Sequence, residues 1–511
     1  MADFETHPLY RIMHPRSIAF WGASNNPTGM GTIQLAQLLS MKFEGAVYPM
    51  HPREKTVAGL PAYEHLSDVP GPVDLAVLIL PTRVVPEVLE ECGSSGVKRA
   101  IIVSAGFGEM GPEGKALQQR IVEIARTHGI HFIGPNCIGV VNPYAKLNTT
   151  FFPYQAPAGF IGMASQSGSF ITQMFVHLEK FGLGFSQGFS LGNEAVTDLV
   201  DCIEYLGECP QTKVIALYVE AIRRGRDFFR VAREVSKKKP IVAYYVGGSE
   251  SGRKAALSHT GALAGPDQLY EGIFKQCGII RATSIEELFD LCYVLGSQPV
   301  PKGNRLAILT HSGGPGAAAA DTAERCGLRL ARFSPQTIEA LSDHVPHTAS
   351  VGNPVDLTFN RNPGDYMQIL PRILLRDQVV DSLFIYLLIP FYRVTQTLEA
   401  TGMNPQEAAV LAKDFIANQC ESVAQIALES GKPVVGGSFC PRTEPFIREL
   451  QDRGVPVLPS PERAVKALAG LAQYAASKEA FLSGQDEPGA TSFPSGEKQA
   501  SAGGCAGCGR E

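Results

Sequence analysis

The chain has 511 residues, of which 44% are hydrophobic and 19% charged, a composition that excludes wholesale disorder. Lys plus Arg number 45 against 50 Asp plus Glu, and the net charge of −5 offers no basic footprint for nucleic acid or an anionic membrane. No apolar run approaches the ~18 residues of a spanning helix, and the N-terminus has no apolar signal region. With 11 scattered cysteines, we expect a reduced, cytoplasmic protein.

The first third of the chain alternates short β-branched runs with amphipathic stretches. Strands are predicted at residues 17–22, 75–80 and 100–104, with helices at 84–92 and 114–128. This βαβ alternation is typical of a doubly wound parallel sheet. We expect a Rossmann-like domain over residues 1–150.

The same alternation recurs twice further along the chain. Strands predicted at 161–165, 214–219 and 240–245 define a second domain over residues 151–298. Strands predicted at 305–310, 382–390 and 433–436 define a third domain over 299–476, after a Pro-rich linker at 297–303. The fold class is therefore α/β, with three doubly wound domains.

Residues 477–511 are rich in Gly, Ser, Ala and Pro without periodicity, and we expect a disordered tail. Cys505 and Cys508 form a lone C-x-x-C in it, and one such pair is not a zinc site, which takes four ligands. An oxidisable dithiol is the favoured interpretation, and a metal knuckle or redox tag is the alternative.

Ligands in open α/β sheets bind beyond the carboxyl ends of the strands. The loop after the first strand holds Gly22, Ala23, Ser24, Asn25 and Asn26 and leads into a helix, a setting that favours phosphate. A plain turn is the alternative.

The spacing of this loop is not the dinucleotide G-x-G-x-x-G. The next strand ends in His51 and Arg53 instead of the carboxylate that NAD sites use. A cation there suits a ribose phosphate, as in NADP or coenzyme A.

The second domain opens with Gln166, Ser167, Gly168 and Ser169 between a strand and a helix. These residues could hold a phosphate at the helix N-terminus or simply cap the helix. Without a bound anion, the sequence does not separate these two interpretations.

Two histidines, His259 and His311, lie in loops of small residues that leave room for a group on the imidazole. Each is a candidate nucleophile or a structural histidine, and residue chemistry alone does not choose between them. A nucleophilic imidazole also needs an orienting acid. Glu220, at the tip of a strand, could be that acid or a solvated strand-end carboxylate.

Taken together, these loops resemble the α subunit of the NDP-forming acyl-CoA synthetases (acetate–CoA ligase, ADP-forming), in the succinyl-CoA synthetase superfamily. The resemblance covers roughly residues 10–475 in order. The matching stretches are Gly22–Ser24, Ser104–Gly108, Gly134–Cys137, Ser165–Gly168, Gly192–Asn193, Tyr218–Glu220, Ser258–Gly261, Gly313–Gly316 and Asn353–Asp356.

The resemblance implies a Rossmann-like CoA-binding domain followed by two flavodoxin-like ligase domains. It implies that His259 is phosphorylated in turnover, that Glu220 stabilises it, and that Gln166 to Ser169 hold the phosphate. The implied CoA contacts, with no metal ligand among them, are Gly22, Ala23, Ser24, Asn25, Asn26, Arg53, Ser104, Ala105, Gly106, Asn136 and Cys137, the last two near the thioester.

The implied reaction interconverts acyl-CoA, phosphate and ADP with free acid, CoA and ATP. The sequence contains no Walker P-loop and no visible nucleotide-grasp domain. We therefore expect ADP or ATP with Mg²⁺ to bind a separate ATP-grasp β subunit, in an α₂β₂ heterotetramer. The alternatives are a non-catalytic protein that binds CoA or acyl-CoA and, less favoured, an NADP-dependent oxidoreductase.

Three positions depart from the pattern of this family. Many ADP-forming relatives carry lysine where this chain has Tyr245 and arginine where it has Gly248, and relatives commonly show asparagine at His311. The first two changes bear on acyl specificity, which the sequence does not define. His311 could be a second phosphate contact or a strand-end donor.

Overall fold

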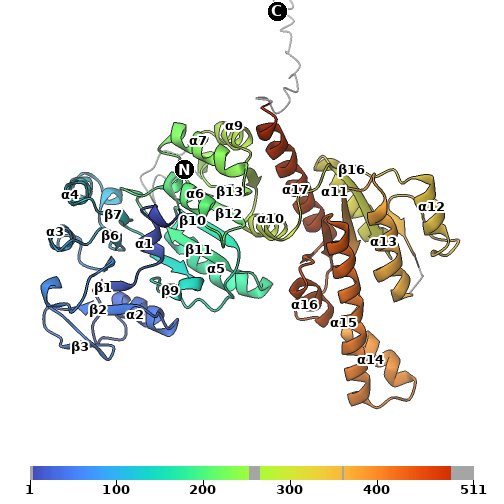
Figure 1. Cartoon of the computed structure of the whole chain (residues 1–511), viewed down its shortest axis with the longest axis horizontal. Helices are drawn as coiled ribbons and strands as arrows, with labels where there is room; N and C mark the ends of the chain where they lie inside the picture. Colours follow the sequence, from blue (N-terminus) through green and yellow to red (C-terminus); the bar gives the residue numbers. More distant parts are fainter. Residues whose placement is uncertain (1–3, 252–264, 359–361, 485–511) are drawn as a thin grey trace, which may run out of the picture.

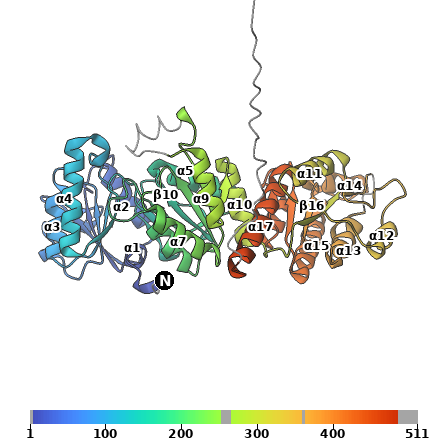
Figure 2. The same ribbon diagram turned by 90° about the horizontal axis from the view of Figure 1, so that it is seen from above.

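The computed structural model describes residues 4–251, 265–358 and 362–484. Within these residues, three mainly parallel sheets are flanked by helices, and the predicted α/β fold class is confirmed (Figure 1). The first two sheets and their helices form one lobe, and the third forms a second lobe (Figures 1 and 2).

The first sheet has five parallel strands in the order β2-β1-β5-β6-β7. Trp21 at the end of β1 pairs in register with Met50 of β2 and Leu78 of β5, so the loops after these strands meet at one edge. The strands are β1 (Ser17–Trp21), β2 (Ala46–Met50), β5 (Leu75–Leu78), β6 (Arg99–Ile102) and β7 (His131–Ile133), with a separate hairpin of β3 (Thr56–Val57) and β4 (Leu60–Pro61). The helices are η1 (Phe4–Thr6), α1 (Tyr10–Met13), α2 (Met30–Ser40), η2 (Leu66–Asp68), α3 (Val85–Ser94), η3 (Gly108–Met110) and α4 (Pro112–His128).

The second sheet has seven strands in the order β14-β13-β12-β10-β11-β8-β9. Strand β8 is antiparallel to both of its neighbours, β11 and β9. Its strands are β8 (Val140–Asn142), β9 (Leu147–Asn148), β10 (Ile161–Ser165), β11 (Phe185–Ser190), β12 (Val214–Val219), β13 (Ile241–Tyr245) and β14 (Ile280–Ala282). The helices are η4 (Pro143–Ala145), α5 (Gly168–Phe181), α6 (Leu199–Glu208), α7 (Gly225–Ser236), α9 (Asp267–Cys277) and α10 (Ile285–Ser297).

The third sheet is parallel, in the order β16-β15-β18-β19-β20, with β17 paired to β15. Its strands are β15 (Arg305–Thr310), β16 (Arg329–Leu330), β17 (Val355–Asp356), β18 (Ser382–Tyr386), β19 (Val434–Gly437) and β20 (Val457–Leu458). The helices are α11 (Gly313–Arg325), α12 (Pro335–Ser342), η5 (Asp365–Ile369), α13 (Leu370–Arg376), α14 (Phe391–Ala400), α15 (Pro405–Ser430), α16 (Pro445–Asp452) and α17 (Pro461–Leu482).

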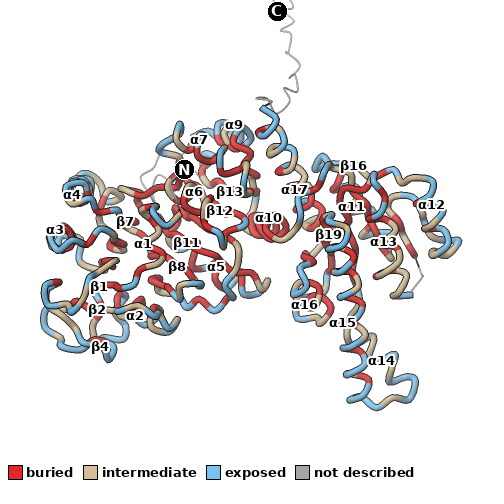
Figure 3. The backbone as a smooth tube through the Cα atoms, in the orientation of Figure 1, coloured by how far each residue is buried: buried red, intermediate tan, exposed pale blue. Residues whose placement is uncertain are grey.

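The strands are red along most of their length in Figure 3, as expected for sheets covered by helices on both faces. One buried apolar cluster joins residues of the first and second sheets, from Ile18 to Phe274, and another joins the second and third through α10 and α17. Burial of apolar surface therefore stabilises both junctions, at about 25 cal/mol per Å².

Three elements bear on the predicted domain limits. β8 and β9 lie in residues 1–150 yet pair within the second sheet, and α17 continues to Leu482, past the predicted end at 476. Cys505 and Cys508 lie outside the described residues. Within the described part of the chain, no helix combines the length and apolar character needed to cross a membrane.

Candidate functional site

The N-terminus of α5 lies at the carboxyl edge of the second sheet. Ser165 ends β10, and its hydroxyl donates to the Ser167 carbonyl at 2.7 Å. Ser167 is the N-cap of α5, but its side chain does not cap the helix. The amide groups of the first turn thus lack the usual side-chain acceptor, and they carry the positive end of the helix dipole. This geometry favours an anion over simple capping.

Gln166 connects this helix start to the end of β12. Its side-chain oxygen accepts from the backbone amides of Glu220 at 2.5 Å and Ala221 at 3.0 Å. Its Nε2 donates to the Ala221 carbonyl and to Oε2 of Glu194, both at 2.7 Å. All four bonds require one orientation of the amide.

Glu220 is buried, with 6% of its surface exposed, so it is not a solvated strand-end acid. It follows Val219, the last residue of β12, and Ser165 of β10 pairs in register with Tyr218 of β12. The strand order thus brings Glu220 next to the phosphate-type loop predicted at Gln166 to Ser169.

Glu194 is a buried carboxyl that the sequence analysis did not single out. It follows β11 in a left-handed conformation, with φ of +49°, and Oε1 accepts from the Leu199 amide at 3.0 Å. Burial raises its pKa to about 8, although Arg223, 3.6 Å away, lowers it in part. The only signal in the sequence is its place directly after the matched pair Gly192 and Asn193.

The predicted CoA loop follows β1. Gly22 has a φ of +95°, and a Cβ there would lie 2.0 Å from the Ile79 carbonyl oxygen, so only glycine fits. The loop is organised by hydrogen bonds within itself and to β3: the Asn26 amide donates to Ser24 Oγ, and Asn25 Nδ2 donates to the Thr56 carbonyl. The N-cap of α2, Gly29, supplies no side chain to that helix start.

Ser104, Ala105 and Gly106 follow β6 at the same edge of the first sheet. The Ser104 hydroxyl donates to the Leu80 carbonyl and accepts from the Leu80 amide, so it ties two strand ends together. The Gly106 and Phe107 amides donate to Oε1 of Glu109 at 2.6 and 3.2 Å.

Glu109 also forms a hydrogen bond across the junction between the first two sheets, because its Oε2 accepts from Asn193 Nδ2. Burial opposes its charge, but hydrogen bonds from Asn193, Gly106 and Phe107 outweigh burial and lower its pKa. Asn193 in turn accepts a hydrogen bond from Asn136 Nδ2 at 3.2 Å. Asn136, which is predicted to lie near the thioester, is therefore hydrogen-bonded to the loop after β11.

Cys137 and Arg53 lie in contrasting surroundings. The Cys137 thiol is buried, donates to the Ile102 carbonyl, and has its pKa raised to about 12 by burial. Any contact of Cys137 with CoA must therefore involve its backbone. Arg53 is exposed in the loop after β2.

The predicted nucleophile, His259, lies outside the described residues. The described residues that follow it begin at Gly265, whose carbonyl accepts from the Tyr245 hydroxyl at 2.7 Å, and Tyr245 stacks on Tyr270 with ring centroids 3.7 Å apart. His311 belongs to another sheet, directly after β15, and its ring contacts the rings of Tyr366 and Tyr386.

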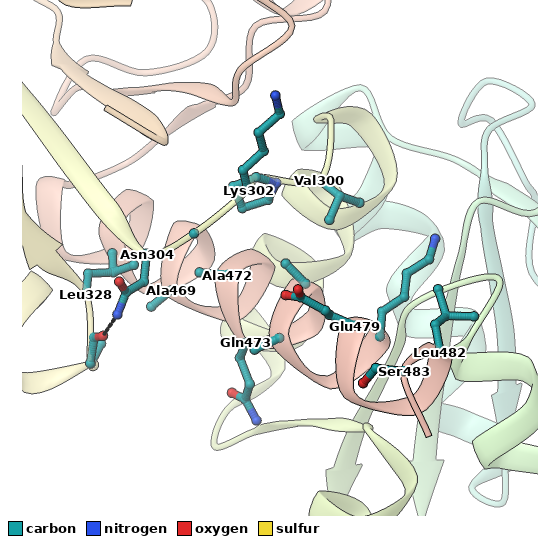
Figure 4. Close-up of a pocket in the computed structure, with 17 residues that line it drawn as sticks. Val300, Lys302, Asn304, Leu328, Ala469, Ala472, Gln473, Glu479, Leu482 and Ser483 are labelled. Carbon is teal, nitrogen blue, oxygen red and sulfur yellow. Dashed lines mark hydrogen bonds between the residues drawn. The ribbon is translucent and has the colours of Figure 1, made fainter. Parts of the chain in front are cut away.

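A cavity of about 940 Å³ lies between α17 and the linker before β15 (Figure 4). It is lined by residues such as Lys302, Leu328 and Glu479, and it includes none of the predicted site residues. Among the described residues, no cluster of His, Cys, Asp and Glu side chains could hold a metal ion.

Three family profiles match the chain in order. A CoA binding domain matches residues 16–143, a succinyl-CoA ligase like flavodoxin domain matches 158–295, and a ligase-CoA domain matches 306–415. These matches define the class: a CoA-binding domain joined to two ligase domains.

Individual relatives agree with this class. The α subunit of acetate–CoA ligase [ADP-forming] II of Pyrococcus furiosus is 39% identical over 91% of this chain and 97% of its own length. The acetate–CoA ligase [ADP-forming] of Methanocaldococcus jannaschii is 41% identical over 71% of this chain, but the match spans only 50% of that longer protein.

Among solved structures, acetyl-coenzyme A synthetase 1 of Ca. Korarchaeum cryptofilum, in complex with phosphate and ADP, has a TM-score of 0.82 and 33% identity. The match covers 93% of this chain and 98% of the chain in that structure. The chain belongs to the ADP-forming acetate–CoA ligase family.

Proposed function

We propose that this chain is the α subunit of an NDP-forming acyl-CoA synthetase, an acid–thiol ligase. It interconverts acyl-CoA, phosphate and ADP with carboxylic acid, CoA and ATP. The observation that carries the proposal is the contact of Gln166 with the Glu220 backbone, which joins a helix N-terminus suited to phosphate to a buried acid. A CoA-binding protein without catalysis has no use for this second site.

The first step takes place between the proposed CoA site of the first domain and the proposed phosphate site at the start of α5. The amides at the start of α5, with Ser167, Gly168 and Ser169, hold the phosphate dianion. A phosphate oxygen attacks the thioester carbonyl, the C–S bond breaks, and CoA leaves as thiolate. The product is an acyl phosphate.

The second step transfers the phosphoryl group to His259. A neutral imidazole nitrogen attacks phosphorus, and the carboxylate leaves with the P–O bonding pair. Glu220 holds the proton on the other ring nitrogen and stabilises the cationic phosphoimidazole. Its burial strengthens that interaction, because the surroundings are less polar than water.

The CoA contacts are assigned to the first domain. The loop of Gly22 to Asn26 and the segment Ser104 to Gly106 meet at one edge, and Arg53 supplies a cation for the ribose phosphate. Asn136 lies near the thioester end, held by Asn193.

The nucleotide is assigned to a partner. The M. jannaschii relative is about twice as long as the region it shares with this chain, whereas the P. furiosus relative is named as a subunit. We therefore assign ADP or ATP with Mg²⁺ to a separate ATP-grasp β subunit, in a cytoplasmic α₂β₂ heterotetramer.

The test is labelling of the purified chain with radioactive phosphate and a panel of acyl-CoAs. We expect acid-labile, base-stable label that requires an acyl-CoA and is absent in His259→Ala. If the label were lost in His311→Ala instead, the nucleophile would be His311. A wild-type chain that binds CoA but takes no label with any thioester would contradict the proposal and favour a binding protein.

A further inference from the structure

The turn after β11 contacts both halves of the proposed site with adjacent residues. Asn193 faces the first sheet and donates to Glu109, whereas Glu194 faces the second site and accepts from Gln166. Gly192 brings this turn against the segment of Pro135 and Asn136, since a Cβ at Gly192 would lie 2.3 Å from both carbonyl oxygens.

Gln166 has two possible amide orientations, which differ by exchange of its oxygen and nitrogen. The oxygen must face the amides of Glu220 and Ala221, because both are donors. The nitrogen then faces Glu194, which must accept. Both oxygens of Glu194 are used as acceptors, one for Gln166 and one for the Leu199 amide.

We infer that Glu194 is a positioning residue: its carboxylate fixes the Gln166 amide, and Gln166 fixes the backbone that carries Glu220. This inference rests on the proposed function for its catalytic consequence, but the mechanical link stands on the hydrogen bonds alone. Glu194 touches no reacting atom in this scheme and acts through Gln166.

Protonation of Glu194 opposes this arrangement. A carboxylic acid places a proton on one oxygen, which then meets an N–H donor from Gln166 or from Leu199. The charged and titratable groups that act on Glu194 are Arg223 after β12, Asp198 before α6, Cys202 on α6 and Tyr270 on α9. Arg223 and the hydrogen bonds from Gln166 and Leu199 favour the ionised form, but burial outweighs them and raises the pKa of Glu194 to about 8.

The first experiment compares labelling rates of wild type, Glu194→Gln and Glu194→Asp from pH 6 to 9. We expect the labelling rate of Glu194→Gln to be about tenfold lower at pH 9, because a displaced Glu220 misaligns the phosphoryl transfer to His259. The ratio of the wild-type rate to the Glu194→Gln rate should rise with pH, with its midpoint near pH 8. The ratio of the Glu194→Asp rate to the Glu194→Gln rate should also rise with pH, because aspartate keeps the ionisable carboxyl. Glu234→Gln removes the same charge at an exposed surface ion pair and should match wild type.

The second experiment does not depend on catalysis. Hydrogen–deuterium exchange of the peptide containing the Glu220 and Ala221 amides should be faster in Glu194→Gln than in Glu234→Gln at the same pH. If wild type takes no label, the proposed function fails, and exchange alone decides: faster exchange keeps the positioning role. Unchanged exchange, or a Glu194→Gln variant with wild-type rate and pH profile, would overturn the inference.

Discussion

The Asn193 side chain donates to Oε2 of Glu109 at 2.6 Å, across the junction between the first and second sheets. The same carboxylate accepts from the Gly106 amide, so the Glu109 side chain connects the segment Ser104 to Gly106 to the turn after β11. Because Asn193 precedes Glu194 directly, a single turn links the proposed CoA-binding residues to the proposed phosphate site.

Replacing Glu109 should weaken CoA binding. Glu109→Gln places an amide NH₂ against the Asn193 donor or against the Gly106 amide, so at least one hydrogen bond is lost, at about 1–3 kcal/mol. We expect the Kd for CoA, measured by isothermal titration calorimetry, to rise about tenfold. Glu113→Gln, exposed on the first turn of α4, is the control. Equal affinities for the two variants would show that the Glu109 hydrogen bonds do not shape the segment Ser104 to Gly106 for CoA binding.

Glu194 should make stability depend on pH. Its pKa is raised from 4.5 to about 8 in the folded chain, so the folded state binds more protons than the unfolded state between these values. Stability from this group is therefore fully present below about pH 4.5 and is lost as pH rises through about 8. The Tm of Glu194→Gln relative to wild type should increase from pH 6 to 9, measured by calorimetry. A difference in Tm that is constant with pH would contradict the burial argument.

Arg53 should distinguish CoA from dephospho-CoA. Its exposed guanidinium lies in the loop after β2, where we assign it to the ribose phosphate. Wild type should bind CoA about tenfold more tightly than dephospho-CoA, and Arg53→Ala should bind both with similar affinity. The neighbouring exposed Lys55→Ala is the control. If Arg53→Ala kept the preference for CoA, another group would hold the phosphate.

Gly22→Ala should be strongly destabilising. Both strain at φ +95° and a clash with the Ile79 carbonyl act there, whereas Gly59→Ala at φ +79° meets no atom within 4 Å. We expect the free energy of unfolding to fall by about 3 kcal/mol for Gly22→Ala and by about 1 kcal/mol for Gly59→Ala, measured by urea denaturation. Similar losses for both would mean that the close approach to Ile79 contributes nothing.

The local patterns of the sequence determined the order of strands and helices and several of the loops between them. The strand predicted at 17–22 contains β1, and the strand at 214–219 coincides with β12. This is because a fully buried parallel strand requires a continuous apolar run, and the turn that follows it requires glycine or polar residues. The residues Gln166 to Ser169 were found in the same way, since a strand followed by a helix start is a local feature.

Only the tertiary structure decided what each side chain contacts. Nothing local distinguishes Ser104, whose hydroxyl ties two strand ends, from a ligand-binding serine, or shows that the Cys137 thiol turns into the core. Glu194 has no motif, and it reaches Gln166 because β10 lies between β11 and β12 in the sheet. Strand order is set by packing between segments far apart in the sequence, and that packing also buries the Glu194 carboxyl and raises its pKa.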